Sequence, residues 1–264
     1  MNSSTAQRLT QLNRDFYEHF GESFAATRRR TQPGVKRMLA SIGSHDAVLD
    51  IGCGTGGVAR ALADAGHKGR YLGIDYSQTM LRQAEMLALP FAARFLLAEI
   101  ESLPDLVGPG SALGARLEEA SFDAVLAFAV LHHVPDAAMR TRLVETVHRL
   151  LRLDGRIIHS NWQFLNSPKL AARIQPWEEA GISASEVDAD DYLLDWRGGG
   201  RGLRYVHNFS PSELSQLAAA TGFRIVDSFQ SDGKGGQLSV YQVWTKAGQA
   251  ASTTTGQHPG LLRG

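Results

Sequence analysis

Apolar residues in the middle of the chain form short continuous runs that alternate with helical patterns. The runs with the length and composition of buried strands are residues 47–51, 70–75, 93–99, 122–130 and 153–162. The helical patterns that follow them are residues 57–66, 77–89 (with Ser77 as N-cap) and 136–152 (with Asp136 as N-cap). Strands that alternate with helices favour an α/β fold, with a mostly parallel sheet and helices on both faces.

The alternation stops after residue 162. Residues 163–208 show no clean periodicity, which predicts an irregular lid inserted before the last helix. A helix capped by Ser210 follows, and two apolar segments then predict a closing pair of strands. We therefore expect three parts: an N-terminal helical cap (1–40), one ligand-binding domain that includes the lid (41–246), and a disordered tail (247–264).

Charge and cysteine content narrow the class of protein. The chain has 27 Lys and Arg residues and 27 Asp and Glu residues, so its formal net charge is zero. This balance removes the simplest electrostatic argument for nucleic-acid binding, although local basic patches are compatible with it. The single cysteine, Cys53, excludes an intrachain disulfide and predicts a reducing, cytoplasmic location. No apolar run reaches membrane-spanning length, so we expect no membrane association.

A glycine-rich loop follows the first predicted strand in the stretch VLDIGCGTGG, residues 48–57. Its glycines fit both the dinucleotide pattern G-x-G-x-x-G and the tighter G-x-G-x-G. Glycines let the backbone approach a ligand closely, whichever ligand is present. The loop alone therefore leaves open a nicotinamide cofactor or S-adenosylmethionine (SAM).

Three acidic residues distinguish these cofactors. Asp50 precedes the loop at the carboxyl end of its strand, where its charge would repel a pyrophosphate but suits the cationic sulfonium and ammonium of SAM. Asp75 ends the next strand and could accept ribose hydroxyls from either cofactor. Glu99 follows the third strand, near the expected adenine edge. Together they favour SAM.

Four segments resemble the successive motifs of the class I SAM-dependent methyltransferases. They are VLDIGCGTGG, GIDYSQTM, FDAVLAFAVLHHV and LLRLDGRIIHSNW, within about residues 46–162. The resemblance implies a Rossmann-like seven-stranded sheet whose last strand is antiparallel, with SAM as cofactor. It also implies the following contacts: Asp50, Gly52, Gly54 and Gly56 with the methionyl part and ribose, Asp75 with the ribose, Tyr76, Met80, Glu99 and Ile100 with adenine, and Phe128 near the transferable methyl.

The acceptor is less constrained. Residues 17–39, including Tyr17 and Arg28, resemble the entry segment of the wobble-uridine carboxymethyl tRNA methyltransferases, as does RYVHNFSPSEL at 204–214. This resemblance implies a tRNA carboxylate acceptor, a cofactor contact from Tyr17, and a small activator subunit as a possible partner. The sequence departs from that family at residues 29–32 and in the glycine-rich segment 195–202.

Candidate catalytic and acceptor residues come from the same segments. Arginine forks suit carboxylates, so Arg28 and Arg204 are expected to hold an anionic acceptor. Of the adjacent His132 and His133, we favour His133 as the functional one, and it or His207 would serve as base for a hydroxyl acceptor. The residues expected to stack on an acceptor base are Trp162 and Tyr205. No Cys/His cluster has metal-ligand spacing, so we predict no metal.

Three functions remain open from the sequence. The first is a tRNA methyltransferase acting at a wobble-uridine carboxymethyl group. The second is a small-molecule O- or N-methyltransferase of the same fold, which the zero net charge favours. The third is a non-catalytic SAM-binding protein.

Overall fold

The computed structural model describes residues 1–26, 30–108 and 117–248. Its central feature is a seven-stranded sheet with the strand order β3-β2-β1-β4-β5-β10-β9. The strands are β1 (Val48–Ile51), β2 (Tyr71–Asp75), β3 (Ala93–Leu97), β4 (Phe122–Phe128), β5 (Leu151–Trp162), β9 (Phe223–Ser231) and β10 (Ser239–Lys246). Strands β1 to β5 pair in parallel, whereas β10 runs antiparallel to both β5 and β9. The predicted sheet and its antiparallel last strand are confirmed.

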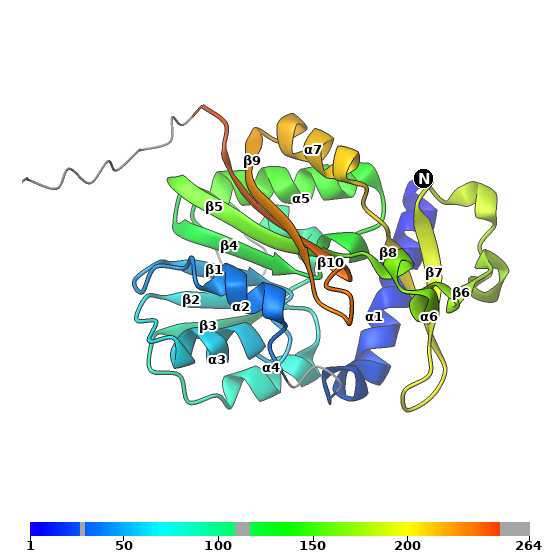
Figure 1. Cartoon of the computed structure of the whole chain (residues 1–264), viewed down its shortest axis with the longest axis horizontal. Coiled ribbons are helices and arrows are strands. Elements are labelled where there is room, and N and C mark those ends of the chain that lie inside the picture. The colour runs from blue at the N-terminus through cyan, green and yellow to red at the C-terminus, as the bar shows by residue number, and fades with distance from the viewer. Residues whose placement is uncertain (27–29, 109–116, 249–264) are drawn as a thin grey trace, which may run out of the picture.

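Helices cover both faces of this sheet (Figure 1). They are α2 (Pro33–Leu39), α3 (Gly57–Asp64), α4 (Gln78–Glu85), α5 (Ala137–Leu150) and α7 (Pro211–Ala220). Adjacent residues of a strand point to opposite faces. Accordingly, Leu49 of β1 packs in the apolar cluster that includes α5 and α7, and Val48 packs in the cluster that includes α2 and α3. Burial on both faces explains why these strands read as continuous apolar runs.

The predicted helix starts are confirmed by their caps. The Ser77 hydroxyl accepts a hydrogen bond from the backbone N–H of Met80 at the start of α4. Asp136 accepts from two backbone N–H groups at the start of α5, and Ser210 accepts from Glu213 N at the start of α7. Each cap satisfies a backbone donor that the helix itself cannot pair, which stabilises the start by about 1 kcal/mol.

The lid segment is more regular than its sequence indicated. It contains a three-stranded antiparallel sheet of β6 (Ile174–Gln175), β7 (Asp191–Trp196) and β8 (Gly202–His207). Its short helical turns are η3 (Phe164–Asn166), α6 (Pro168–Ala171), η4 (Trp177–Ala180) and η5 (Ala184–Glu186). The strand pattern was missed because Leu193 and Leu194 of β7 are both buried, in apolar clusters on opposite faces. Such a strand shows no alternation of apolar and polar residues.

The N-terminal helix α1 (Ser3–Ala26) packs against this small sheet. Leu9 of α1 shares an apolar cluster with Leu193 and Tyr205, and Phe16 shares another with Trp196. Figure 1 shows α1 and β6–β8 lying together beyond the carboxyl ends of the central strands. Helix α1 of the predicted cap and the lid therefore cover that end of the sheet together, whereas α2 of the same cap segment packs on a face of the sheet.

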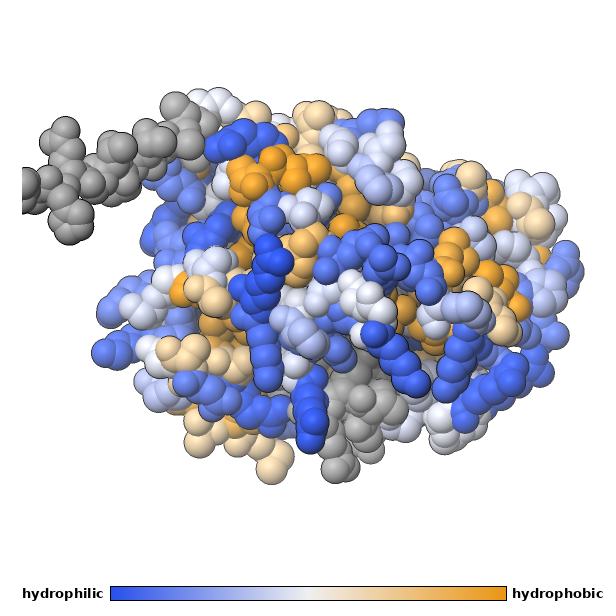
Figure 2. Space-filling model, viewed as in Figure 1, coloured by the Kyte–Doolittle hydropathy of each residue, from blue (hydrophilic) through white to orange (hydrophobic). Residues whose placement is uncertain are grey.

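Hydrophilic residues dominate the face seen in Figure 2, and apolar residues form small groups among them. Within the described ranges, no helix is both long enough and apolar enough to span a bilayer. The predicted disordered tail lies outside the described residues from position 249 onward.

Candidate active site

A cavity of about 260 Å³ lies at the carboxyl ends of β1, β2 and β4, beneath α1. Open α/β sheets bind ligands at this edge. Among the residues predicted to hold the cofactor, those that line the cavity are Tyr17, Gly52, Gly54, Asp75, Tyr76, Met80, Glu99, Ile100 and Phe128. The structure therefore brings together side chains that are up to 111 positions apart in the chain, from Tyr17 to Phe128.

The glycine loop turns sharply between β1 and α3. Gly52, Gly54 and Gly56 have φ angles of +71°, +54° and +74°, a region that favours glycine. Gly54 donates its backbone N–H to the Asp75 carboxylate at 2.9 Å, which links the loop to the end of β2. Gly56 was predicted to contact the cofactor, but it does not line the cavity. It lies at the start of α3 and packs against Leu87 and Ala84.

Asp50 also does not lie where a cofactor contact was predicted. Its side chain is buried behind the loop, does not line the cavity, and accepts a 2.6 Å hydrogen bond from the Tyr71 hydroxyl. Burial raises the pKa of the Asp50 carboxyl to about 7, although the Tyr71 hydrogen bond acts in the opposite direction. Asp50 therefore lies behind the glycine loop, bonded to Tyr71, and does not border the cavity.

The raised pKa of Asp50 predicts a pH-dependent stability. Since an unfolded aspartate titrates near pH 4, the free energy of unfolding should fall between about pH 4 and the folded pKa of about 7. We expect Asp50→Asn to be more stable than the wild type at pH 8, by on the order of 1–3 kcal/mol, with the difference shrinking toward pH 4. Denaturant melts across this pH range measure the effect. An asparagine variant less stable than wild type at pH 8 contradicts it.

Asp75 holds the loop and the following helix together. One carboxylate oxygen accepts from Gly54 N and the other from Ser77 N, both at 2.9 Å. Burial raises the pKa of the Asp75 carboxyl, and the backbone donors oppose that rise. The side chain still borders the cavity, beside Tyr76 and Met80.

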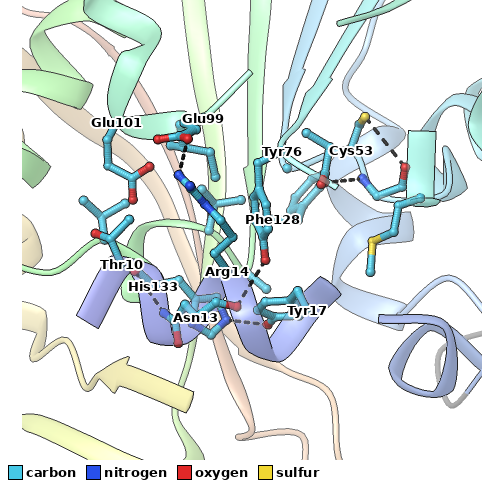
Figure 3. Close-up of a pocket in the computed structure, with 18 of the residues that line it drawn as sticks. Thr10, Asn13, Arg14, Tyr17, Cys53, Tyr76, Glu99, Glu101, Phe128 and His133 are labelled. Carbon is cyan, nitrogen blue, oxygen red and sulfur yellow. Dashed lines mark hydrogen bonds and ion pairs between the residues drawn. The ribbon is translucent and has the colours of Figure 1, made fainter. Parts of the chain in front are cut away.

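The residues that follow β3 form an acidic end of the cavity. Glu99 pairs with the Arg14 guanidinium, which reaches across from α1 (Figure 3). Glu101 also lines this end, and burial raises the pKa of its carboxyl. The lining residues that were not predicted include Thr10, Asn13, Arg14 and Glu101. The first three share helical spacing with Tyr17, so one face of the predicted cap helix was the signal that could have found them.

His133 is the histidine that lines the cavity. Its Nε2 lies 2.9 Å from the Tyr17 hydroxyl (Figure 3). Its Nδ1 lies 3.1 Å from the backbone oxygen of Tyr205. A carbonyl oxygen can only accept, so Nδ1 carries a proton; in the neutral ring Nε2 is then the acceptor. His132 instead is 1% exposed, and its Nδ1 accepts from the backbone N–H of Trp162.

Several predicted acceptor residues do not reach the cavity. Arg204 is buried, and its guanidinium lies over the rings of Phe16 and Trp162, at 5.4 and 4.7 Å from their centroids. Arg204 and Trp162 therefore stack on one another, and neither lines the cavity. Arg28 lies outside the described residues.

Tyr205 and His207 also do not lie at the predicted acceptor site. The Tyr205 side chain is 0% exposed and donates a 2.7 Å hydrogen bond to Asp191, so it cannot stack on an acceptor. His207 is held between Asp191 and Glu213, at 2.7 and 2.8 Å. Burial acts to lower the pKa of His207, but its two acidic partners raise it overall. Both side chains belong to the core between the small sheet and its neighbours, because alternate residues of β8 face inward there.

No metal site accompanies the cavity in the part of the chain that the structure describes. There, no three His, Cys, Asp or Glu side chains gather closely enough to hold a metal ion. Burial also raises the pKa of the Cys53 thiol, which favours its protonated form.

The chain is similar to known methyltransferases. Residues 48–155 match the methyltransferase domain family. A putative methyltransferase of Encephalitozoon cuniculi is 26% identical over 80% of this chain and 87% of its own length. The chloroplastic tocopherol O-methyltransferase of Arabidopsis thaliana is 31% identical over 50% of this chain. The tRNA (carboxymethyluridine(34)-5-O)-methyltransferase ALKBH8 of Macaca fascicularis is 27% identical over 60%. The chain spans only 34% and 21% of the last two proteins.

Solved structures share the fold. A SAM-dependent methyltransferase from Methanosarcina mazei superposes with a TM-score of 0.60 at 21% identity, over 80% of this chain and 96% of that one. A Haloferax volcanii putative methyltransferase, solved in complex with the Trm112 methyltransferase activator, gives a TM-score of 0.61 at 17% identity, over 89% and 97%.

Proposed function

Because the chain is a SAM-dependent methyltransferase with the class I fold, we propose that it methylates a hydroxyl oxygen of a small molecule, with His133 as general base. The observation that carries this proposal is the orientation of His133. Its Nδ1–H is fixed by the Tyr205 carbonyl, so its basic Nε2 is directed toward Tyr17 in the cavity. A hydroxyl must lose its proton when it is methylated, whereas a carboxylate at neutral pH has none to lose.

The cavity suits SAM. Asp75 and Glu99 provide carboxylates at its wall. Arg14, the one lining arginine or lysine among the described residues, is already paired with Glu99. A pyrophosphate would meet repulsion there, whereas hydroxyls and amines can donate to these oxygens. Asp75 would hold the ribose, with Glu99 and Ile100 beside adenine and Gly52 and Gly54 along the methionyl part.

SAM, when bound, supplies a methyl group already activated by the adjacent sulfonium. The protein then has to orient the acceptor, exclude water and accept one proton. Helix α1 covers the cavity, and the acceptor hydroxyl would lose its proton to His133 Nε2, either directly or as the Tyr17 hydroxyl gives its own proton to Nε2 and takes up that of the acceptor. Phe128, also on the wall, would limit how the acceptor lies against the methyl.

A second candidate is methylation of a tRNA carboxymethyluridine. It is supported by the similarity of residues 17–39 to that enzyme group and by the ALKBH8 relative, which carries this activity in its name. The fold shared with the Haloferax protein would extend this candidate to a small activator subunit. Against it, two arginines of the lid are already in ion pairs: Arg197 with Asp195, and Arg201 with Glu179.

Labelled SAM distinguishes the two candidates. The protein is incubated with methyl-labelled SAM and either a metabolite extract or total tRNA, and the label is then located by mass spectrometry. We expect an O-methylated small molecule and no labelled nucleoside. Label in a carboxymethyluridine ester would replace the first candidate with the second, and salt-dependent inhibition by bulk tRNA would accompany it.

A further inference from the structure

Asn13, on the inner face of α1, binds the backbone of two other elements. Its side chain is 6% exposed. Its Oδ1 accepts from Tyr205 N at 2.8 Å, and its Nδ2 donates to Tyr205 O at 3.2 Å. The same Nδ2 donates to His133 O at 3.3 Å. Only one orientation of the amide satisfies a donor and two carbonyl acceptors at once, so the position requires asparagine chemistry.

The Tyr205 carbonyl connects Asn13 to the proposed base, His133. It accepts from Asn13 and also from Nδ1 of His133, at 3.1 Å. A carbonyl oxygen has two lone pairs, and both are used here. Asn13 therefore fixes the acceptor that selects the His133 tautomer, and it simultaneously fixes the backbone that carries the His133 ring.

We propose that Asn13 is a positioning residue that keeps His133 in the tautomer with the proton on Nδ1 and none on Nε2. This inference rests on the proposed role of His133 as base. One turn further along the same helix face, Tyr17 meets that Nε2, so α1 acts on both nitrogens of the ring: directly through Tyr17 and indirectly through Asn13. If α1 shifts, both contacts are lost together.

The Asn13→Asp variant tests this directly. The two side chains have nearly the same shape, but aspartate replaces the donating Nδ2 with an oxygen that faces two carbonyl oxygens. We expect kcat to fall on the order of ten- to a hundredfold, because the base is misplaced. The Kd for SAM, measured by calorimetry, should change little. Gln11→Ala is the matched control, since Gln11 is exposed on the same helix and bonds only to Asp15 among the contacts described for it; its kcat should equal that of wild type.

Nitrogen-15 NMR of the histidine side chains reads the tautomer itself, and comparison with His133→Gln assigns the signal. We expect the wild type to show Nδ1–H at His133, and Asn13→Asp or Asn13→Ala to show a mixture of tautomers. A wild-type protein with the proton on Nε2 overturns the inference without any variant having to fold. The inference is also overturned if a folded Asn13→Asp variant has the wild-type kcat and the wild-type tautomer. The proposed function fails separately, if His133→Gln itself retains the wild-type kcat.

Discussion

Replacing His133 with alanine should lower kcat by about 10²–10⁴-fold if the acceptor is a hydroxyl. The reason is that the substitution removes the one imidazole that lines the cavity within the described residues, and with it the acceptor for the proton. The KM for SAM should change much less, because the His133 ring contacts Tyr17 and the Tyr205 backbone, at the proposed acceptor side. Steady-state kinetics on the acceptor identified by labelling measure both quantities.

A matched control is His45→Ala, since His45 is exposed, lies outside the cavity and contacts Ser44. Its kcat should match that of the wild type. A His133→Ala enzyme within about threefold of the wild-type kcat would falsify the role of general base, because such catalysis contributes at least about 10²-fold. That result would favour a carboxylate acceptor, which requires no base.

Gly52→Ala should both destabilise the protein and weaken SAM binding. Gly52 has a φ of +71°, and a Cβ added there would lie 2.7 Å from Cγ2 of Val130. The left-handed conformation costs an alanine about 1–2 kcal/mol, and the clash adds to that cost. Since Val130 also lines the cavity, its displacement would narrow the space beside the loop. We expect a Kd for SAM at least about tenfold higher, a loss of about 1.4 kcal/mol in binding free energy.

Gly66→Ala separates backbone strain from the clash. Gly66 has a similar φ of +79°, but an added Cβ would meet no atom within 4 Å, and the residue is outside the cavity. Thermal melts should show a smaller destabilisation in this variant, and calorimetry should show an unchanged Kd for SAM. If Gly66→Ala weakens SAM binding as much as Gly52→Ala does, the close approach at Gly52 is not the cause.

The part of the site built on the central sheet was predictable because its residues follow strands. Gly52, Asp75, Glu99 and Phe128 lie at or just after the ends of successive strands. Parallel strands bring such positions to one edge, so the order of motifs along the chain is sufficient to place them together. The exceptions are Asp50, which is buried within β1, and Gly56, which caps α3 and packs against Leu87 and Ala84.

The part of the site built by the cap and lid was not predictable in the same way. Arg204, Tyr205 and His207 were expected at the acceptor, yet their side chains are buried among Trp162, Asp191 and other neighbours. From β8, the backbone carbonyl of Tyr205 contacts His133 at the site. A backbone carbonyl is present at every residue, so the sequence does not indicate which one takes part.

The amino-acid sequence by itself determined the sheet, its helices and the cofactor edge, because hydrophobic periodicity and turn chemistry act over short stretches of chain. Only the tertiary structure decided that α1 and the small sheet pack into one cover, and that Asn13, Tyr17 and the Tyr205 carbonyl converge on His133. These contacts join residues 72 to 120 positions apart through single hydrogen bonds. Such contacts depend on how whole elements dock, and a local pattern carries no information about docking.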